Sequence, residues 1–304
     1  MIKLRVKKRK QYQVLDLFSG IGGFGYGLQL AGMNVQAFCE INPYQQKVLN
    51  KHWSDVPIYC DIQELNGEYL RENFPELDVF CGGFPCTDIS VAGKHDGGLD
   101  GKDSGLWYEY RRLIKEYLPR IAVIENVSGL RGRGLTRILQ DLAQIGYDAT
   151  WTLFDSQYFG VPQRRRRIYI VAVRDGIPAY ADFFQFEERN KKACREQVGL
   201  INKSREWLLH EGKKEWSHLA YFTKQSHGEY SEKGVSGTIL KRDTADLISD
   251  NGRLRRVMPK ERMLLQGFPE DWLIDSTLKD MFTASGMTVP VVKYIGERII
   301  HANF

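Results

Sequence analysis

Cys86 is the first residue whose position suggests chemistry, because it directly follows a proline just after the apolar run 77–83. Proline fixes φ and lacks an N–H, so a Phe-Pro-Cys step ends the hydrogen-bond ladder of a strand and turns the next side chain outward. A thiol presented in this way could act as a nucleophile. A small buried hydrophobe in a loop is the commoner fate of a free cysteine, and the stretch CGGFPCTDIS alone does not separate the two interpretations.

Two further polar motifs lie beside apolar runs. Glu125 closes the run IAVIENV, where desolvation would raise its pKa toward the protonated form at neutral pH; a helix-capping or ion-paired carboxylate is the alternative. In VPQRRRRIYIVAV, the alternation of a strand places Gln163, Arg165 and Arg167 on one face. We expect this face to meet an anion, and a solvated basic strand end is the alternative.

A glycine loop follows the first apolar run, in the order strand, loop, helix. Gly20, Gly22 and Gly25 satisfy the G-x-G-x-x-G pattern. Glu40 ends the next strand, where a carboxylate can accept hydrogen bonds from ribose hydroxyls, and Asp61 follows a further short strand near a possible adenine edge. This predicts an adenosine-containing cofactor: a nicotinamide or flavin dinucleotide, or S-adenosylmethionine. A glycine turn that only packs a helix on a strand is the alternative.

These motifs need a scaffold that gathers the ends of strands. Between residues 13 and 174, β-rich runs alternate with helical segments, which predicts an α/β fold with a doubly wound, mostly parallel sheet. We expect strands at 14–18, 35–40, 77–83, 122–127, 150–155 and 167–173, and helices at 22–31, 43–53, 106–117, 135–145 and 289–300. Asn42 is the expected cap of the second helix. Carboxyl ends of parallel strands share one edge, so the motifs should line one crevice.

Composition and charge narrow the class of protein. The 304 residues include five cysteines without a C-x-x-C pair, which supports neither a disulfide framework nor a zinc cluster. No apolar window approaches the roughly 18 residues of a spanning helix, and the basic start MIKLRVKKRK has no apolar region behind it, so we expect a cytoplasmic protein. The net charge of +5 permits a polyanionic partner.

The patterning divides the chain into three segments. Residues 1–174 form the expected catalytic and cofactor-binding domain. Residues 175–252 are charged, with scattered tryptophans and glycines and no clean period, which suggests a smaller lobe. Strong patterning returns in 253–304, which we expect to complete the first domain.

Taken in order, the motifs resemble the blocks of prokaryotic or phage-type DNA (cytosine-5) methyltransferases. The blocks are DLFSGIGGF, the Glu40 strand, GGFPC, ENV, QRRRR, LLQGFP and GMTVPVV. The resemblance covers residues 13–174 and about 253–304, and it leaves the middle lobe, which in that family is the target recognition domain. It implies a Rossmann-like fold that uses S-adenosylmethionine.

The resemblance implies methyl transfer to carbon 5 of a cytosine flipped out of duplex DNA. Cys86 would add to carbon 6, and a protonated Glu125 would stabilise charge at nitrogen 3. Arg165 and Arg167 would hold the base carbonyl and nearby backbone, with Gln163 in support. An RNA methyltransferase and a DNA-binding pseudo-enzyme are the alternatives, and a dehydrogenase fits the glycine loop alone.

The resemblance also implies two sets of binding residues. Those expected at the cofactor are Asp16, Phe18, Ser19, Gly20, Ile21, Gly22, Gly23, Glu40, Ile41, Asp61, Ile62, Gly83, Pro85, Leu106, Thr288 and Val289. Those expected at the substrate are Gln163, Thr87, Ser90 and Thr238. Thr87 stands where the family commonly has glutamine, and Met287 stands where it has a cofactor-contacting asparagine. Duplex DNA is the expected partner, a cognate restriction endonuclease could act separately, and we expect a monomer.

Overall fold

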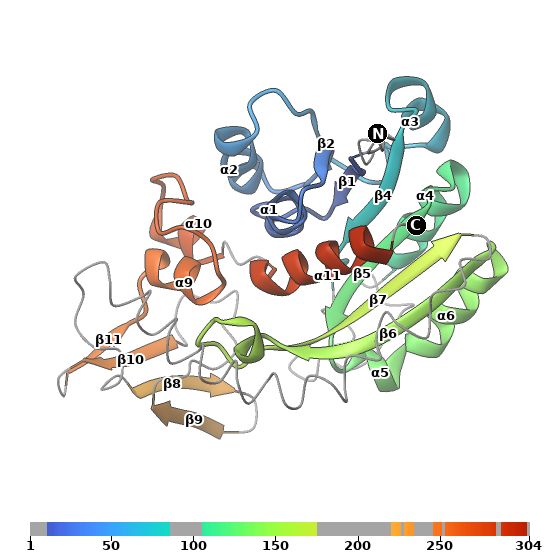
Figure 1. Cartoon of the computed structure of the whole chain (residues 1–304). Coiled ribbons are helices and arrows are strands. Elements are labelled where there is room, and N and C mark those ends of the chain that lie inside the picture. Colours follow the sequence, from blue (N-terminus) through green and yellow to red (C-terminus); the bar gives the residue numbers. More distant parts are fainter. Residues whose placement is uncertain are drawn as a thin grey trace, which may run out of the picture.

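The computed structural model describes residues 11–85, 105–174, 220–225, 228–233, 246–250, 253–283 and 287–302. Its main body is a seven-stranded sheet with helices on both faces (Figure 1). The strands are β1 (Gln13–Leu17), β2 (Asn34–Cys39), β3 (Ile58–Tyr59), β4 (Leu77–Gly82), β5 (Ile121–Val127), β6 (Tyr147–Asp155) and β7 (Arg166–Arg174). In this described part, no helix has the length and apolar character needed to span a membrane.

The helices connect the strands and close the chain. They are α1 (Gly23–Leu30), α2 (Pro43–His52), α3 (Gly67–Asn73), α4 (Leu106–Tyr117), α5 (Leu130–Arg133), α6 (Leu135–Gln144), the 3₁₀ helix η2 (Ser156–Phe159), α9 (Pro259–Leu265), α10 (Leu278–Thr283) and α11 (Val289–Ala302). Asn42 caps α2 as predicted, because its Oδ1 accepts hydrogen bonds from the N–H groups of Tyr44 at 2.9 Å and Gln45 at 3.1 Å.

The strand order is β3-β2-β1-β4-β5-β7-β6. The first five strands of the chain pair in parallel, whereas β7 is antiparallel to both β5 and β6. The link from β6 to β7 spans only residues 156–165, too short for the crossover that a parallel pair requires, so the chain turns back on itself. The predicted mostly parallel α/β sheet is therefore confirmed, with one strand reversed.

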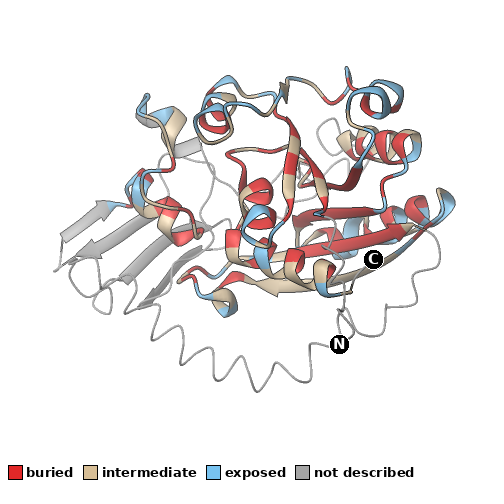
Figure 2. Cartoon of the chain, turned by 45° about the horizontal axis from the view of Figure 1, so that its top comes forward, coloured by how far each residue is buried: buried red, intermediate tan, exposed pale blue. Residues whose placement is uncertain are grey.

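Alternate side chains of the central strands supply two separate cores. Phe80 and Ile124 face a core that includes residues of α4 and α6. Val79 and Val123 face the other core, which includes residues of α1 and α11. Both β4 and β5 are almost wholly buried, as Figure 2 shows for the middle of the sheet, and this explains their continuous apolar runs.

The last helix, α11, lies beside α1 on one face of the sheet (Figure 1). Glycines permit the close approach of the two helices. A Cβ added at Gly27 would lie 2.6 Å from the Cβ of Val292, and one added at Gly296 would lie 2.7 Å from the Cβ of Ala31. The end of the chain thus buries apolar surface against the helix that follows the glycine loop.

A second, four-stranded antiparallel sheet has the order β11-β10-β8-β9. Its strands are β8 (Ala220–Gln225), β9 (Gly228–Lys233), β10 (Asp246–Asp250) and β11 (Arg253–Arg256). The sequence predicts none of these strands, nor α3, α5, α9, α10 or η2, because these segments are short or lack a clean period. The division into three segments stays a prediction, and β11, at the start of the third, pairs with β10.

We expect Gly296→Ala to lower the free energy of unfolding by about 1–3 kcal/mol, because the added methyl group overpacks the contact with α1. Gly132→Ala is the matched control, since a Cβ there meets nothing within 4 Å, and it should be neutral or stabilise by up to about 1 kcal/mol. Urea unfolding of both variants measures the difference, and equal effects would contradict this account of the α1–α11 contact.

Candidate active site

The glycine loop takes its shape from backbone conformations that favour glycine. Gly20 and Gly22 have φ values of 60° and 84°, and Phe18 before them also has a positive φ of 54°. Ser19 ties the loop to the sheet: its Oγ donates to the carbonyl of Asp16 at 2.6 Å and accepts from the N–H of Cys39 at 3.2 Å. The loop is therefore held at the carboxyl ends of β1 and β2.

Close packing requires the later glycines of the motif. A Cβ at Gly22 would lie 2.7 Å from the ring of Trp53, and a Cβ at Gly25 would lie 2.8 Å from the ring of Phe38. Gly22 and Gly25 therefore serve helix packing at least in part. A glycine turn that packs a helix on a strand is the alternative to a cofactor loop that the sequence left open. Gly20 and Gly22 still need their positive φ, and Ile21 beside them is fully buried.

Glu40 joins the loop to the end of β2. The residue is only 8% exposed, and its carboxylate accepts the N–H of Gly20 on Oε2 at 2.7 Å and the N–H of Asn42 on Oε1 at 2.8 Å. Each carboxylate oxygen has a second lone pair for a ligand hydroxyl. The next residue, Ile41, is 71% exposed and offers an apolar surface beside the carboxylate.

Asp16 lies beneath the glycine loop, where its side chain binds the backbone at the start of α1. Its side chain is fully buried, and its Oδ2 accepts the N–H of Gly25 at 2.8 Å. Burial raises the pKa of Asp16 to about 8, although the Gly25 N–H opposes this shift; the charge of Glu40 raises the pKa further, and a hydrogen bond with Cys81 lowers it. The carboxyl group therefore keeps its proton through neutral pH.

Glu125 lies at the end of β5 between two arginines. Its Oε1 is 3.2 Å from Nε of Arg167 and 3.9 Å from Nη2 of Arg165, and all three side chains are 15% exposed or less. The pairing of β5 with β7 sets Val127 opposite Arg167, so the start of the antiparallel strand meets the end of β5. The expected protonated state of Glu125 stays a prediction.

The QRRRR segment alternates between inside and outside as the sequence predicts. Gln163 is buried, Arg165 and Arg167 are largely buried, and the two arginines between them are exposed. The segment is held by Ser156, whose Oγ donates to the carbonyl of Gln163 at 2.6 Å, and by Asp155, whose Oδ1 accepts the N–H of Arg165 at 3.2 Å.

The side-chain amide of Gln163 is fully buried, and neither its Oε1 nor its Nε2 has a hydrogen-bond partner among the described residues. A buried amide left unsatisfied costs roughly 1–3 kcal/mol. Such an orphaned donor and acceptor, on the same face as the two arginines that contact Glu125, indicates a place where a polar ligand or water binds.

Asn126 holds the segment that leads to Cys86, a contact that the sequence analysis missed. Its Nδ2 donates to the carbonyl of Phe84 at 3.1 Å, and its Oδ1 accepts the N–H of Val127 at 2.8 Å. A Cβ at Gly83 would lie 2.8 Å from Oε2 of Glu125, so the backbone just before Pro85 lies against the carboxylate. The position of Asn126 beside Glu125 in the ENV motif is the sequence signal that could have predicted its contact with the chain before Cys86.

Cys86, Thr87, Ser90 and Thr238 lie outside the described residues. Of the remaining predicted cofactor residues, Thr288 and Val289 are buried at the start of α11, where the N–H of Val289 donates to the carbonyl of Gln266 at 3.0 Å.

Three more of them border α4. Asp61 and Ile62 begin the turn after β3, and Asp61 accepts the N–H of Gln63 on Oδ1 at 2.9 Å. Leu106 is the first residue of α4 and is half-buried.

Met287, which stands where the family commonly has asparagine, packs between three parts of the site. A Cβ at Gly23 would lie 2.7 Å from its Cβ, and a Cβ at Gly83 would lie 3.3 Å from its Cε. The hydroxyl of Tyr169 donates to its sulfur at 3.7 Å. Burial raises the pKa of Tyr169, so the phenol keeps the proton that it donates. Met287 therefore connects the glycine loop with β4 and β7.

The family model for C-5 cytosine-specific DNA methylases matches residues 12–301. The chain belongs to this family. Type II methyltransferase M1.ScrFI from Lactococcus lactis subsp. cremoris is 31% identical over 97% of this chain and 79% of the relative. Type II methyltransferase M.HhaI from Haemophilus parahaemolyticus is 24% identical, over 98% of this chain and 97% of the relative.

The fold agrees with this membership. The crystal structure of the S. pombe Dnmt2 methyltransferase superimposes with a TM-score of 0.70 at 22% identity, covering 97% of this chain and all of that one. The predicted family and Rossmann-like methyltransferase fold are confirmed, and the chain is a DNA cytosine-5 methyltransferase. The dehydrogenase that the glycine loop alone allows is thereby set aside.

The buried Asp16 predicts a pH dependence of stability. The folded protein keeps the proton of this carboxyl up to a pH of about 8, whereas an unfolded aspartate releases it near pH ~4. Between these values the folded state binds more protons, so the contribution of Asp16 to stability falls as pH rises.

Asp16→Asn removes this titration while keeping an acceptor for the Gly25 N–H. We expect the unfolding free energy of the variant, relative to the unsubstituted protein, to rise by about 1 kcal/mol per pH unit between about pH 5 and about pH 8. Urea unfolding across that range measures it. Parallel pH profiles for the two proteins would show that Asp16 already ionises near its ordinary pKa.

Proposed function

We propose that the protein transfers a methyl group from S-adenosylmethionine to carbon 5 of a cytosine flipped out of duplex DNA, through a covalent adduct with Cys86. The observation that carries this mechanism is the position of Glu125. Its carboxylate contacts Arg167 on one side and the backbone of Gly83 on the other, three residues before Cys86 in the chain. The acid group of Glu125 and the thiol of Cys86, which follow two neighbouring strands, would then both contact the same cytosine.

The residues at the glycine loop fit a bound S-adenosylmethionine. The carboxylate of Glu40 has free lone pairs for ribose hydroxyls, and the exposed Ile41 beside it can cover one face of the adenine. The residues that would hold the cofactor are the glycine loop 18–23, Glu40, Ile41, Asp61, Ile62, Gly83, Pro85, Leu106, Thr288 and Val289. When bound, the cofactor supplies an electrophilic methyl group on a sulfonium.

Asp16 supports the cofactor from beneath the loop. Its Oδ2 binds the N–H of Gly25 and its side chain is fully buried. We therefore assign Asp16 to shaping the loop, while the loop backbone approaches the cofactor.

Carbon 5 of cytosine is a poor nucleophile, so the reaction begins with the addition of the Cys86 thiolate to carbon 6. The π electron pair of the carbon 5–carbon 6 double bond moves to carbon 5, and charge that spreads toward nitrogen 3 is stabilised by a proton on Glu125. Carbon 5 would then take the methyl group, and the sulfur–methyl bond would break to leave the neutral thioether S-adenosylhomocysteine. A base removes the carbon 5 proton, and the thiolate leaves carbon 6 to restore the ring.

The arginine face completes the base pocket in this proposal. Arg167 and Arg165 lie beside Glu125, with nitrogens 3.2 Å and 3.9 Å from its Oε1, and guanidinium groups can also donate to the cytosine carbonyl. Gln163 adds a buried amide with unused hydrogen-bonding capacity. Because a base inside a duplex cannot reach such a pocket, the cytosine has to be flipped out.

Recognition of a specific DNA sequence is proposed for the segment 175–252, in which most of the small sheet lies. Thr238 in this segment is the proposed residue near the flipped base, and Thr87 and Ser90 would meet the DNA beside Cys86. We propose that the protein works as a monomer, and that a cognate restriction endonuclease, if one exists, acts separately. The expected cytoplasmic location stays a prediction.

The decisive experiment offers S-adenosylmethionine with a tritiated methyl group to duplex DNA, total transfer RNA and duplex DNA that contains 5-fluorocytosine. We expect label in duplex DNA, together with an adduct on the fluorinated duplex that survives denaturation, because fluorine at carbon 5 blocks release of the thiolate. Label only in transfer RNA would instead identify an RNA methyltransferase. Cofactor binding without any transfer would identify a pseudo-enzyme.

Cys86→Ser should lower the rate of methyl transfer at least ~10³-fold, because a hydroxyl is a far weaker nucleophile than a thiolate at neutral pH. Binding of duplex DNA, measured by fluorescence anisotropy, should remain within about twofold as the control. Retained turnover in this variant would rule out the covalent mechanism.

Glu125→Gln keeps the size of the side chain but removes the acid proton. We expect the single-turnover rate of methyl transfer to fall ~10²- to 10⁴-fold, with the Kd for S-adenosylmethionine unchanged within about twofold. Rapid-quench kinetics and calorimetry measure the two quantities. An unchanged rate would remove the assigned role of Glu125.

A further inference from the structure

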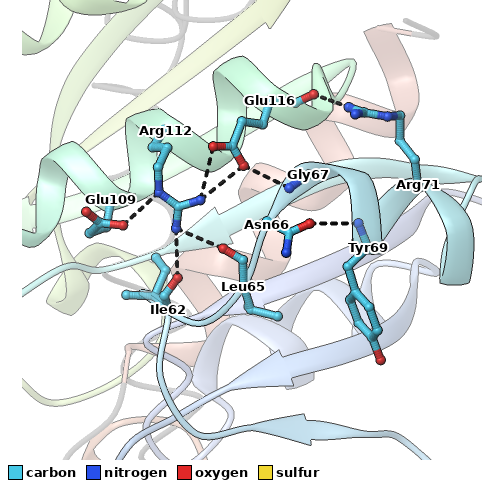
Figure 3. A network of polar contacts seen from close by, with 9 residues as sticks. All are labelled: Ile62, Leu65, Asn66, Gly67, Tyr69, Arg71, Glu109, Arg112 and Glu116. Carbon is cyan, nitrogen blue, oxygen red and sulfur yellow. Dashed lines mark hydrogen bonds and ion pairs between the residues drawn. The ribbon is translucent and has the colours of Figure 1, made fainter.

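A polar network at the border of the site described above joins α4 to the segment that follows β3. Figure 3 shows its residues, which come from α4, from the start of α3 and from the turn that precedes α3. We call residues 61–67 the adenine-side turn, because it begins with Asp61 and Ile62, two of the proposed cofactor residues.

Arg112 of α4 is the centre of this network. Its Nη2 donates to the carbonyl of Ile62 at 3.0 Å and to the carbonyl of Leu65 at 2.8 Å. Its Nε donates to Glu109 Oε2 at 2.8 Å, and its Nη1 donates to both carboxylate oxygens of Glu116, at 3.2 Å and 3.0 Å. One planar guanidinium therefore uses its full fork of donors to hold two backbone carbonyls of the turn between two carboxylates.

Desolvation acts to lower the pKa of Arg112, but the hydrogen bonds to Glu109 and Glu116 outweigh it and raise the pKa above its ordinary value. Both carboxylates lie on the same helix as the arginine, at the i−3 and i+4 positions. The helix thus orients its own arginine before the arginine reaches the turn, which lowers the entropic cost of the contact.

Glu116 provides a second anchor at the other end of the turn. Its Oε2 accepts the N–H of Gly67 at 2.8 Å, and its carbonyl accepts a hydrogen bond from Arg71. A Cβ at Gly67 would lie 2.4 Å from the Cβ of Glu116, so the two backbones approach as closely as glycine allows. The turn is bound to α4 at both its beginning and its end.

The sheet itself holds this turn only weakly. The strand before it, β3, has two residues, which pair with Phe38 and Cys39 of β2, and the carbonyl of Tyr59 also accepts the N–H of Glu40 at 2.9 Å. The path of the chain from Asp61 to α3 therefore depends on the contacts with α4 and on the buried side chains of Ile62 and Leu65. The same helix begins at Leu106, a third proposed cofactor residue.

We propose that Arg112 is a positioning residue for the adenosine end of S-adenosylmethionine: through the carbonyls of Ile62 and Leu65 it fixes the turn that begins with Asp61, relative to Leu106 on its own helix. The inference rests on the proposed use of this cofactor. Arg112 does not touch the cofactor in this scheme, and its effect is confined to how tightly adenosine-containing ligands bind.

The test uses Arg112→Met and Arg112→Lys in the full chain. Methionine keeps the apolar stem and loses every donor, whereas a lysine ammonium cannot serve both carbonyls and both carboxylates in one plane. Arg111→Met is the matched control. Arg111 is the neighbouring residue on α4, and its contacts are with Gln144 at 3.1 Å and Asp141 at 3.9 Å, both on α6 and away from the turn.

Calorimetry with S-adenosylmethionine and with S-adenosylhomocysteine gives the readout. For Arg112→Met we expect the Kd of both ligands to rise about tenfold and by the same factor, because they share the adenosine and differ only in the methyl group on sulfur. The kcat at saturating cofactor should stay within about twofold. For Arg112→Lys we expect a rise in Kd that is smaller than the rise for Arg112→Met. Arg111→Met should leave both Kd values within about twofold of those of the unsubstituted protein.

Other outcomes overturn the inference. If Arg112→Met and Arg111→Met lower the melting temperature alike and leave both Kd values unchanged, Arg112 is only a structural contact. A loss restricted to S-adenosylmethionine, or a loss of kcat alone, would place its effect at the methyl group instead. If Arg112→Met does not fold, the Kd values and the kcat of Arg112→Lys test the inference in the same way. Failure of the unsubstituted protein to bind either ligand would refute the proposed cofactor. Because this result needs no variant, it is distinguished from a failure of the inference about Arg112.

Discussion

The contact of the Glu125 side chain with Arg167 of β7, and with Arg165 just before that strand, is the one on which the site depends. Burying a carboxyl group at the end of a central strand has a desolvation cost, which a polar or charged partner has to compensate. Arg167 supplies that partner at 3.2 Å. It can do so only because β7 runs antiparallel beside β5, so that the beginning of one strand meets the end of the other. A parallel β7 would carry the arginines to the opposite edge of the sheet.

The same edge of the sheet is shaped by carboxyl groups that bind the protein's own backbone. Asp16 binds the N–H of Gly25 from below, and Glu40 binds the N–H of Gly20 from the side. Asn126 likewise holds the carbonyl of Phe84, before Pro85 and Cys86. Glu40 and Asn126 each hold the chain that follows a neighbouring strand, whereas Asp16 holds the helix that follows its own strand. Contacts within the protein therefore organise this edge of the sheet.

Two helices distant in the chain from the first strands complete this arrangement. The last helix, α11, begins just after Met287, which packs against Gly23 and Gly83. On the other face, α4 carries Arg112, which holds the turn after β3. The glycine loop and the adenine-side turn thus each take support from a helix that the local sequence does not connect to them.

The sequence by itself determined the fold class and most of the strands and longer helices between residues 13 and 174, although not α3, α5 or η2. It also predicted that the glycine loop, Glu40 and the ENV motif lie at the ends of strands. Backbone constraints of glycine and proline, and the periods of strands and helices, are local properties, so GIGGFG, FPC and ENV could be interpreted without coordinates. The tertiary structure decided the reversed direction of β7 and the partners of Glu125, Asn126 and Met287. It also placed Arg112 against the turn that begins at Asp61. These contacts join segments far apart in the chain, and no local period encodes which donor meets which acceptor across that distance.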